Sequence, residues 1–211
     1  MNLKIIYEDN DLLVIDKPAG VNSDDFPKRV HRLDKDTSGV LLIAKNDDAL
    51  EFFQKQFKER KVEKEYITLV AGNLKNQEGV IETLFGRSPK DRKKQRVFLP
   101  SDPGFEGKRE AKTYYKVLQR FKGYDLLKVA LEGGRKHQIR AHCTYLNHPV
   151  AGDKLYGFKN QPIPQNLKRQ FLHASFLKIR LPNNQTKEFK SELPKDLKLC
   201  LQNLKPLTNY N

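Results

Sequence analysis

Short blocks of apolar residues, separated by polar turns, run along most of the chain and favour strands over helices. Residues 3–8 and 11–15 form two such blocks around Asn10, and residues 40–44 form an uninterrupted block that ends in polar residues. Blocks of this length between turn residues are typical of strands. The same pattern predicts further strands over residues 64–70, 79–85, 113–118, 124–131 and 171–181.

Residues 46–60 show the clearest helical spacing. Leu50, Phe53 and Phe57 recur at the interval that places side chains on one face of a helix, so we expect them to face the core. Asp48 is the expected N-cap of this helix, because its carboxylate suits the unpaired N–H groups of a first turn.

Two shorter helices are predicted further along the chain. Ile139, Cys143 and Leu146 lie on one helical face, and Pro194 is a suitable first residue for a final helix. Residues 151–170 contain several Gly and Pro residues and are expected to form a loop. Strands outnumber helices, so we predict an α+β fold around a mainly antiparallel mixed sheet, in a single domain over residues 1–211.

The charge of the chain points to a polyanionic partner. The 211 residues include 40 Lys and Arg against 26 Asp and Glu, a net charge of +14. Nucleic acid is the first candidate, because an anionic membrane would require a basic amphipathic anchor and none of convincing length is present. Residues 87–96 hold six basic residues and one acidic residue, which predicts a basic loop.

Several kinds of site are disfavoured by the residues themselves. His137 and His142 are five residues apart, which differs from the four-residue spacing of a zinc helix, and no CxxC pair occurs. Cys143 and Cys200 lie in unrelated contexts, which indicates a reducing compartment and no disulfide framework. No signal peptide or bilayer-spanning apolar run is found, so we expect a cytoplasmic protein with no membrane partner.

A cluster of charged residues precedes the strand over residues 40–44. His31, Arg32 and Asp34 fall within four residues and are followed by a Thr37-Ser38-Gly39 turn. A turn at the mouth of a buried strand is a rigid place to hold a polar side chain. On spacing alone, the alternative of a solvated turn with a local ion pair is favoured.

Arg140 is the second residue of interest. It follows Ile139 and so borders the apolar face of the short helix, where a half-buried guanidinium needs a carboxylate or phosphate partner. The alternative is a side chain that reaches solvent. The neighbouring basic residues Arg135 and His137 support phosphate contact in either case.

A set of motifs, in one order along most of the chain, resembles the RluA-type pseudouridine synthases. The main matches are His31-Arg32-Leu33-Asp34 with Thr37-Ser38-Gly39, Lys64-Glu65-Tyr66 and the segment from Gly134 to His142. Supporting matches are Asp16-Lys17-Pro18-Ala19-Gly20, His148-Pro149-Val150-Ala151-Gly152-Asp153 with Tyr156-Gly157, and Leu172-His173-Ala174.

The resemblance implies an isomerase that converts selected uridines in RNA to pseudouridine in the catalytic fold of that family. It implies that Asp34 is the catalytic carboxylate, either as nucleophile at the ribose anomeric carbon or as the base that forms a glycal. Tyr66 corresponds to the active-site tyrosine that stacks on the flipped uracil, and Arg140 to the basic partner of the aspartate. Arg32 corresponds to the residue that helps to displace the target base from the RNA helix.

The remaining expectations concern RNA contact and organisation. Arg135, His137 and the loop residues Arg92, Lys93 and Lys94 are the predicted substrate-binding residues. The resemblance implies rRNA or tRNA as the substrate and neither metal nor organic cofactor, and we expect a monomer. The motifs begin near Met1, so we expect no separate N-terminal RNA-binding domain. The alternative function is a non-catalytic RNA-binding or ribosome-associated protein that uses the same basic face.

Overall fold

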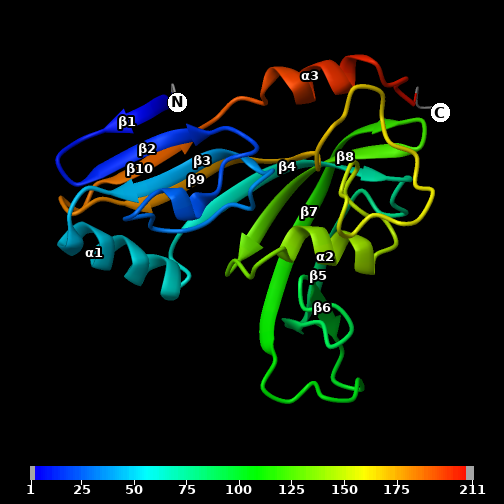
Figure 1. Cartoon of the computed structure of the whole chain (residues 1–211), viewed down its shortest axis with the longest axis horizontal. Helices are drawn as coiled ribbons and strands as arrows, with labels where there is room; N and C mark the ends of the chain where they lie inside the picture. The colour runs from blue at the N-terminus through cyan, green and yellow to red at the C-terminus, as the bar shows by residue number, and fades with distance from the viewer. Residues whose placement is uncertain (1–2, 208–211) are drawn as a thin grey trace. The chain divides into compact units, whose positions relative to one another are not determined.

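A computed structural model describes residues 3–207 of the chain, which divide into two compact units. Of the described residues, the first unit comprises residues 3–66 and Leu172–Pro194, and the second comprises Ile67–Phe171 and residues 195–207. The chain passes from one to the other within strand β4 (Glu63–Ala71) (Figure 1). The sequence predicts one domain over residues 1–211. That prediction would require the two units to form one domain, and it stays a prediction.

The first unit is built on a mixed sheet. Its strands are β1 (Lys4–Glu8), β2 (Leu12–Lys17), β3 (Ser38–Ala44), β9 (Leu172–Arg180) and β10 (Thr186–Lys190). Neighbouring strands pair antiparallel except β3 and β9, which run parallel and meet at Ser38 opposite His173 and Gly39 opposite Ala174. The loop that enters β3 is therefore anchored where two distant segments of the chain come together.

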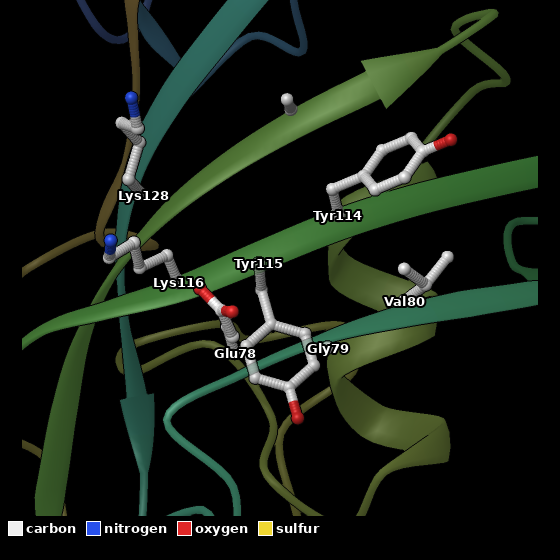
Figure 2. Close-up of a pocket in the computed structure, with 8 residues that line it drawn as sticks. Glu78, Gly79, Val80, Tyr114, Tyr115, Lys116 and Lys128 are labelled. Carbon is white, nitrogen blue, oxygen red and sulfur yellow. The ribbon is translucent and has the colours of Figure 1, made fainter.

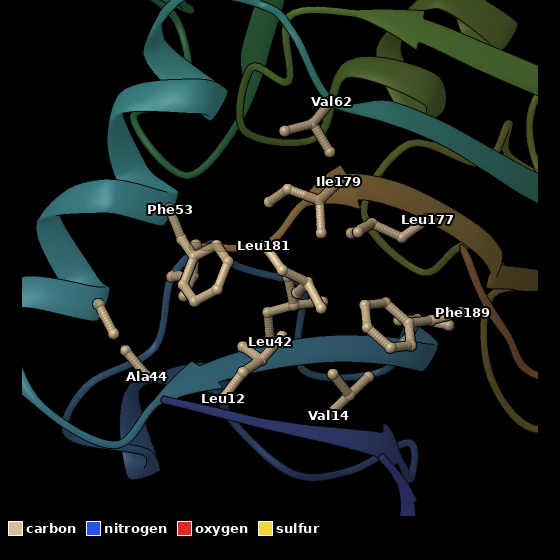
Figure 3. Packing of buried hydrophobic residues seen from close by; sticks show 13 residues of the cluster. Leu12, Val14, Leu42, Ala44, Phe53, Val62, Leu177, Ile179, Leu181 and Phe189 are labelled. Carbon is tan, nitrogen blue, oxygen red and sulfur yellow. The ribbon is translucent and has the colours of Figure 1, made fainter. Parts of the chain in front are cut away.

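Helix α1 (Asp47–Lys58) covers one face of this sheet (Figure 1). Phe53 is fully buried in a core cluster that also contains Leu42, Leu177 and Phe189 (Figure 3), and Leu50 and Phe57 pack against the same cluster as predicted.

The prediction that Asp48 caps α1 is wrong. The side chain of Asn46 accepts the N–H of Ala49 at 2.8 Å, so the cap lies two residues before the expected one and the helix begins at Asp47. Asp47 and Asp48 instead lie in the first turn, where negative charge suits the helix dipole.

The second unit contains an antiparallel sheet in the order β8-β7-β5-β6 and two helices. The elements are β5 (Glu78–Arg87), β6 (Gln95–Phe98), β7 (Arg109–Phe121), β8 (Tyr124–Glu132), α2 (Gln138–Tyr145) and α3 (Lys195–Gln202). Ile139 and Cys143 of α2 are buried, as their spacing predicts. A small core cluster of Phe85, Ala111 and Ala141 joins α2 to this sheet.

The α+β fold and its mainly antiparallel sheet are confirmed, with three local corrections. The predicted basic loop at 87–96 is shorter, because Arg87 ends β5 and Gln95 begins β6. Pro194 precedes α3 and is not its first residue. Strand β10 and a single 3₁₀ turn at Ser23–Asp25 were not expected from the sequence. Within residues 3–207, no helix is long and apolar enough to cross a membrane.

Candidate active site and nucleic-acid interface

The backbone on both sides of Asp34 is held by hydrogen bonds from distant residues of the first unit. The Ser23 hydroxyl donates to the Leu33 carbonyl and accepts the Leu33 N–H, both at 2.9 Å. Leu33 itself is buried in a core cluster with Leu41 and Ala174. The Asp34 carbonyl accepts the N–H of Thr37 at 3.0 Å, which closes the turn. Leu33 thus anchors the turn, and Arg32 and Asp34 flank that anchor.

A buried lysine holds the residue that follows Asp34. Lys17 is fully buried, and its ammonium group donates to three backbone carbonyls, of Pro18, Val21 and Lys35, at 2.9, 2.8 and 3.1 Å. The Gly20 N–H also donates to the Lys35 carbonyl at 2.9 Å. A buried ammonium is stable only with such partners. The Asp16–Gly20 motif therefore helps to brace the turn that carries Asp34.

The C-terminal end of the same turn is fixed by a buried histidine of β9. His173 Nε2 lies 3.0 Å from the Ser191 carbonyl, which can only accept, so this nitrogen carries the proton. In the neutral ring, Nδ1 then accepts from the Ser38 hydroxyl at 2.9 Å. Gly39 is required beside it, because a Cβ at this position would lie 2.1 Å from the Ala174 carbonyl oxygen.

The first unit brings Asp34 and Tyr66 together. Tyr66 is half-buried and packs against the core cluster that contains Leu33. Burial, and secondly the negative charge of Asp34, raise the pKa of the Tyr66 phenol well above its ordinary value. Tyr66 is therefore a neutral phenol at physiological pH, suited to stacking and to donating a hydrogen bond. Asp34 is half-buried, and Arg32 is exposed on the same turn.

His31 belongs to the packing of the turn. Its Nε2 accepts the Leu42 N–H at 3.2 Å, and its ring stacks on Phe57 with centroids 4.8 Å apart. The Lys64 ammonium lies 5.4 Å from the Phe57 ring centroid. Burial, followed by the charge of Lys64, lowers the pKa of His31 to about 3, and burial lowers the pKa of Lys64 to about 8. His31 is thus a neutral structural residue at physiological pH.

Arg140 lies in the second unit and forms a buried, bidentate ion pair with Asp153. The Arg140 Nε lies 2.6 Å from Asp153 Oδ2, and Nη2 lies 2.8 Å from Oδ1. Asp153 also accepts the N–H groups of Leu155 and Tyr156. Burial alone would raise the pKa of Asp153, but the hydrogen bond and charge of Arg140 outweigh it and the pKa lies below its usual range. A guanidinium has five N–H donors, and these bonds use two of them.

Three of the predicted site residues, His137, Arg140 and Lys94, lie close to Tyr156 in the second unit. His137 Nδ1 lies 3.0 Å from the Tyr156 hydroxyl, and the Arg140 guanidinium lies 5.1 Å from the ring centroid. The Lys94 ammonium lies 5.9 Å from the same centroid. The Tyr156 hydroxyl also accepts the Gln95 N–H at 2.6 Å, so one aromatic ring links α2 to the start of β6.

The other predicted RNA contacts are accessible. Arg92 and Lys93 are exposed on the loop between β5 and β6, and Lys94 is half-buried. Arg135 is half-buried, and its Nε donates to the Glu110 carbonyl at 3.3 Å. Among residues 3–207, no group of three or more His, Cys, Asp or Glu side chains is arranged to hold a metal ion. Burial raises the pKa of Cys143 to about 12, which leaves this thiol unreactive.

The sequence motifs predicted Asp34 and Tyr66 as site residues, which stays a prediction, but did not indicate the residues that hold the Asp34 turn in place. Lys17 and Asp153 lie within motifs that were recognised, whereas no sequence signal marked Ser23. The structure also gives Arg140 a carboxylate partner, Asp153, that was not predicted. The predicted pairing of Arg140 with Asp34 involves residues of both units and stays a prediction.

Comparisons with known proteins agree on one family. The profile of the family described as RNA pseudouridylate synthase matches residues 24–145. The chain is 37% identical over 232 residues to a protein of Borreliella burgdorferi named ribosomal large subunit pseudouridine synthase D, covering 95% of this chain and 68% of that one. It is 41% identical over 194 residues to an uncharacterized RNA pseudouridine synthase of Aquifex aeolicus, covering 78% of this chain and 59% of that one.

A solved structure shows the same fold. Human RNA pseudouridylate synthase domain containing 1 matches with a TM-score of 0.84 and 29% identity, over 100% of this chain and 91% of that one. A mixed-sheet unit that braces an aspartate beside a tyrosine, followed by a basic second unit, fits this class of protein. The chain belongs to the RNA pseudouridylate synthase family, which confirms the resemblance found in its motifs. It spans 59% of the length of the Aquifex aeolicus relative and 56% of a second relative, from Chloroflexus aurantiacus.

Proposed function

We propose that this chain isomerises uridine in RNA to pseudouridine, with Asp34 as the catalytic carboxylate. The observation that carries the proposal is the braced turn, in which Leu33, Asp34 and Lys35 each have their carbonyl oxygen bound within the first unit. A reacting carboxylate must be held within a fraction of an ångström of its target, and such bracing provides that precision. Family membership supports the same function.

The reaction breaks the bond between C1′ of the ribose and N1 of uracil and forms a bond between C1′ and C5. In one route the Asp34 carboxylate attacks C1′ and the uracil leaves as an anion, turns and returns through C5. In the other route Asp34 removes the C2′ proton while the uracil leaves as an anion, which forms a glycal, and it returns that proton to C2′ when C5 bonds to C1′. In both routes the proton on C5 is finally lost and N1 gains one, so no oxidant, reductant or cofactor is consumed.

Tyr66 has a supporting role beside Asp34. Burial, and secondly the charge of Asp34, keep its phenol protonated in the free protein. The ring stacks on the detached uracil, and the phenol assists, as a hydrogen-bond partner, the loss of the C5 proton after the C1′–C5 bond has formed and the Asp34 carboxylate has been released.

RNA contact is assigned to exposed and half-buried basic side chains of both units. Arg32 enters the RNA stack beside Asp34, while Arg92, Lys93, Lys94, Arg135 and His137 contact phosphate groups. Arg140 is included as the basic partner of Asp34. Because relatives are named as ribosomal large subunit synthases, we propose large-subunit rRNA as substrate, with tRNA as the second candidate. We further propose a cytoplasmic monomer.

The test compares two aspartates of one turn. Asp34→Asn removes the carboxylate with little change in shape, and Asp36→Asn is the control because Asp36 is exposed on the same turn. Release of tritium from [5-³H]uridine-labelled rRNA or tRNA measures the product. We expect no product from Asp34→Asn, unchanged RNA affinity, and near-normal activity from Asp36→Asn. Normal turnover by Asp34→Asn would overturn the mechanism, and RNA binding without turnover by the unmodified chain would establish the non-catalytic alternative.

A further inference from the structure

The second unit contains a hollow next to the loop between β5 and β6. It lies between β6 and the C-terminal part of α2 and has a volume of about 490 Å³. Val97 and Ala141 give it an apolar floor, and Tyr145 and Tyr156 supply aromatic walls. Tyr145, the last residue of α2, is 44% exposed although it is a large aromatic residue. A partly apolar recess with an available ring suits a flat, aromatic ligand.

Two cations stand at the rim of this hollow. Lys94 lies over the Tyr156 ring at 5.9 Å, and Arg96 lies over the Phe98 ring at 4.8 Å. The rim continues into the exposed loop that carries Arg92 and Lys93. The site therefore combines an aromatic recess with a positively charged border, the pairing of features that binds single-stranded nucleic acid.

Two acidic residues, Asp91 and Asp102, lie near the positive charges of Lys94 and Arg96. Asp102 accepts the Leu99 N–H at 3.0 Å, and Asp91 accepts the Lys93 N–H at 2.9 Å through its side chain. Both carboxylates are therefore engaged with backbone amides. Asp102 lies 3.4 Å from Arg96, a long and partly exposed pair that contributes little binding energy.

A second hollow of the same unit provides a contrast. It lies on the exposed face of β5, β7 and β8, has a volume of about 380 Å³ and also presents a tyrosine, Tyr114, which is 38% exposed. Figure 2 shows Glu78 beside Lys116, its partner across the strands. Tyr114 itself donates to Glu132 at 3.4 Å. Charge is balanced on this face, so it has no comparable attraction for RNA.

We propose that the hollow between β6 and α2 binds one unpaired nucleotide of the substrate RNA, separate from the uridine that is isomerised. The base stacks on Tyr145 above the apolar floor, and the adjoining phosphates lie against Lys94 and Arg96. The site would select RNA with an unpaired residue near the target over continuous duplex. This inference rests on the proposed function for its ligand, and its test is independent of catalysis.

The test uses the full chain carrying Asp34→Asn, which holds RNA without turnover. A hairpin RNA with an unpaired loop and a fully paired duplex of equal length are compared by fluorescence anisotropy. Tyr145→Ala should weaken loop binding about five- to tenfold or more, since stacking contributes on that scale, and leave duplex binding within about twofold. Lys94→Gln should weaken both RNAs. Tyr114→Ala is the matched control and should weaken neither.

A second measurement locates the base. RNA that carries 5-iodouridine at single loop positions should, on irradiation, crosslink to Tyr145, as identified by mass spectrometry of the peptides. Equal loop affinity for Tyr145→Ala and no crosslink to this tyrosine would overturn the inference, even if the unmodified chain forms pseudouridine. A crosslink at Tyr145 without any product from the unmodified chain would support the nucleotide site and reject the proposed function.

Discussion

Two charged segments of this chain are held in opposite ways. The Asp34 turn, residues 31–39, is bound to segments far away in the sequence, including Ser23, Lys17 and His173. The basic loop, Ser88–Lys94, is bound mainly to itself: the Ser88 N–H donates to the Lys94 carbonyl, and Lys94 N–H donates to the Asp91 carbonyl. The first segment has its position set by the core of its unit, whereas the second is a local hairpin loop.

This difference matches the two tasks that we assign to them. Bond rearrangement requires a carboxylate at one position, and distant anchors limit its movement. Attraction of RNA requires charge within reach of phosphate groups, and long, exposed side chains meet that need without fixed geometry. Changes in the turn should therefore affect the rate of the chemical step, and changes in the loop should affect binding and its dependence on salt.

The largest effect is expected where the turn enters β3. In Gly39→Ala the new methyl group would lie 2.1 Å from the Ala174 carbonyl oxygen, and Gly39 has a φ of +117°. The two strands must separate to admit it, so we expect a loss of more than about 4 kcal/mol in the free energy of unfolding. Urea denaturation measures this loss.

Gly20→Ala is the matched control for this variant. Gly20 also has a positive φ, of +87°, but no atom lies within 4 Å of the added methyl group. Only backbone strain is introduced, so the expected loss is about 1 to 2 kcal/mol. Equal losses in the two variants would show that the close contact between β3 and β9 does not limit this turn.

A smaller effect is expected at Ser23. Ser23→Ala leaves the N–H and C=O of buried Leu33 without the hydroxyl that binds both, which should cost about 1 to 3 kcal/mol of stability. Asp34 then gains freedom, so kcat should fall about tenfold at unchanged pH optimum while KM changes less than threefold. Single-turnover assays measure the rate of the chemical step separately from RNA binding.

The exposed neighbour Asp25 supplies the control, and Asp25→Ala should change kcat by less than about twofold. If Ser23→Ala lowers stability but leaves kcat unchanged at a temperature where it is fully folded, then Ser23 supports the fold alone. The bracing of Asp34 would then have to come from Lys17 and Thr37.

These two regions also show what sequence alone can and cannot predict. The strand after the turn was predicted because its apolar run is continuous, and Asp34 and Tyr66 could be proposed as site residues because their motifs are short and contiguous. Ser23 was missed because its partner, Leu33, is ten residues away, across a connection with no periodic pattern. Side chain-to-backbone bonds of this kind depend on the path of the chain, which local propensity does not determine.

The basic loop illustrates the opposite limit. Its charge was evident from composition, yet its ends were misplaced because Arg87, Gln95 and Arg96 are polar residues within strands. An edge hairpin can expose such residues on one face, so polarity alone does not distinguish strand from loop there. The carboxylate partner of Arg140 was missed for a related reason, since Asp153 lies in a segment with no regular structure.

The smallest effect is expected in the basic loop. Arg92→Gln with Lys93→Gln removes two exposed cations and should raise KM a fewfold while leaving kcat within about twofold. The slope of log Kd against log salt concentration should fall by about 2, one for each phosphate contact removed. Lys116→Gln with Lys128→Gln removes the same charge from the balanced face in Figure 2 and should change the slope by less than 1. Equal changes in both double variants would mean that RNA binding depends only on the net charge of the protein. The basic loop would then have no specific role in RNA binding.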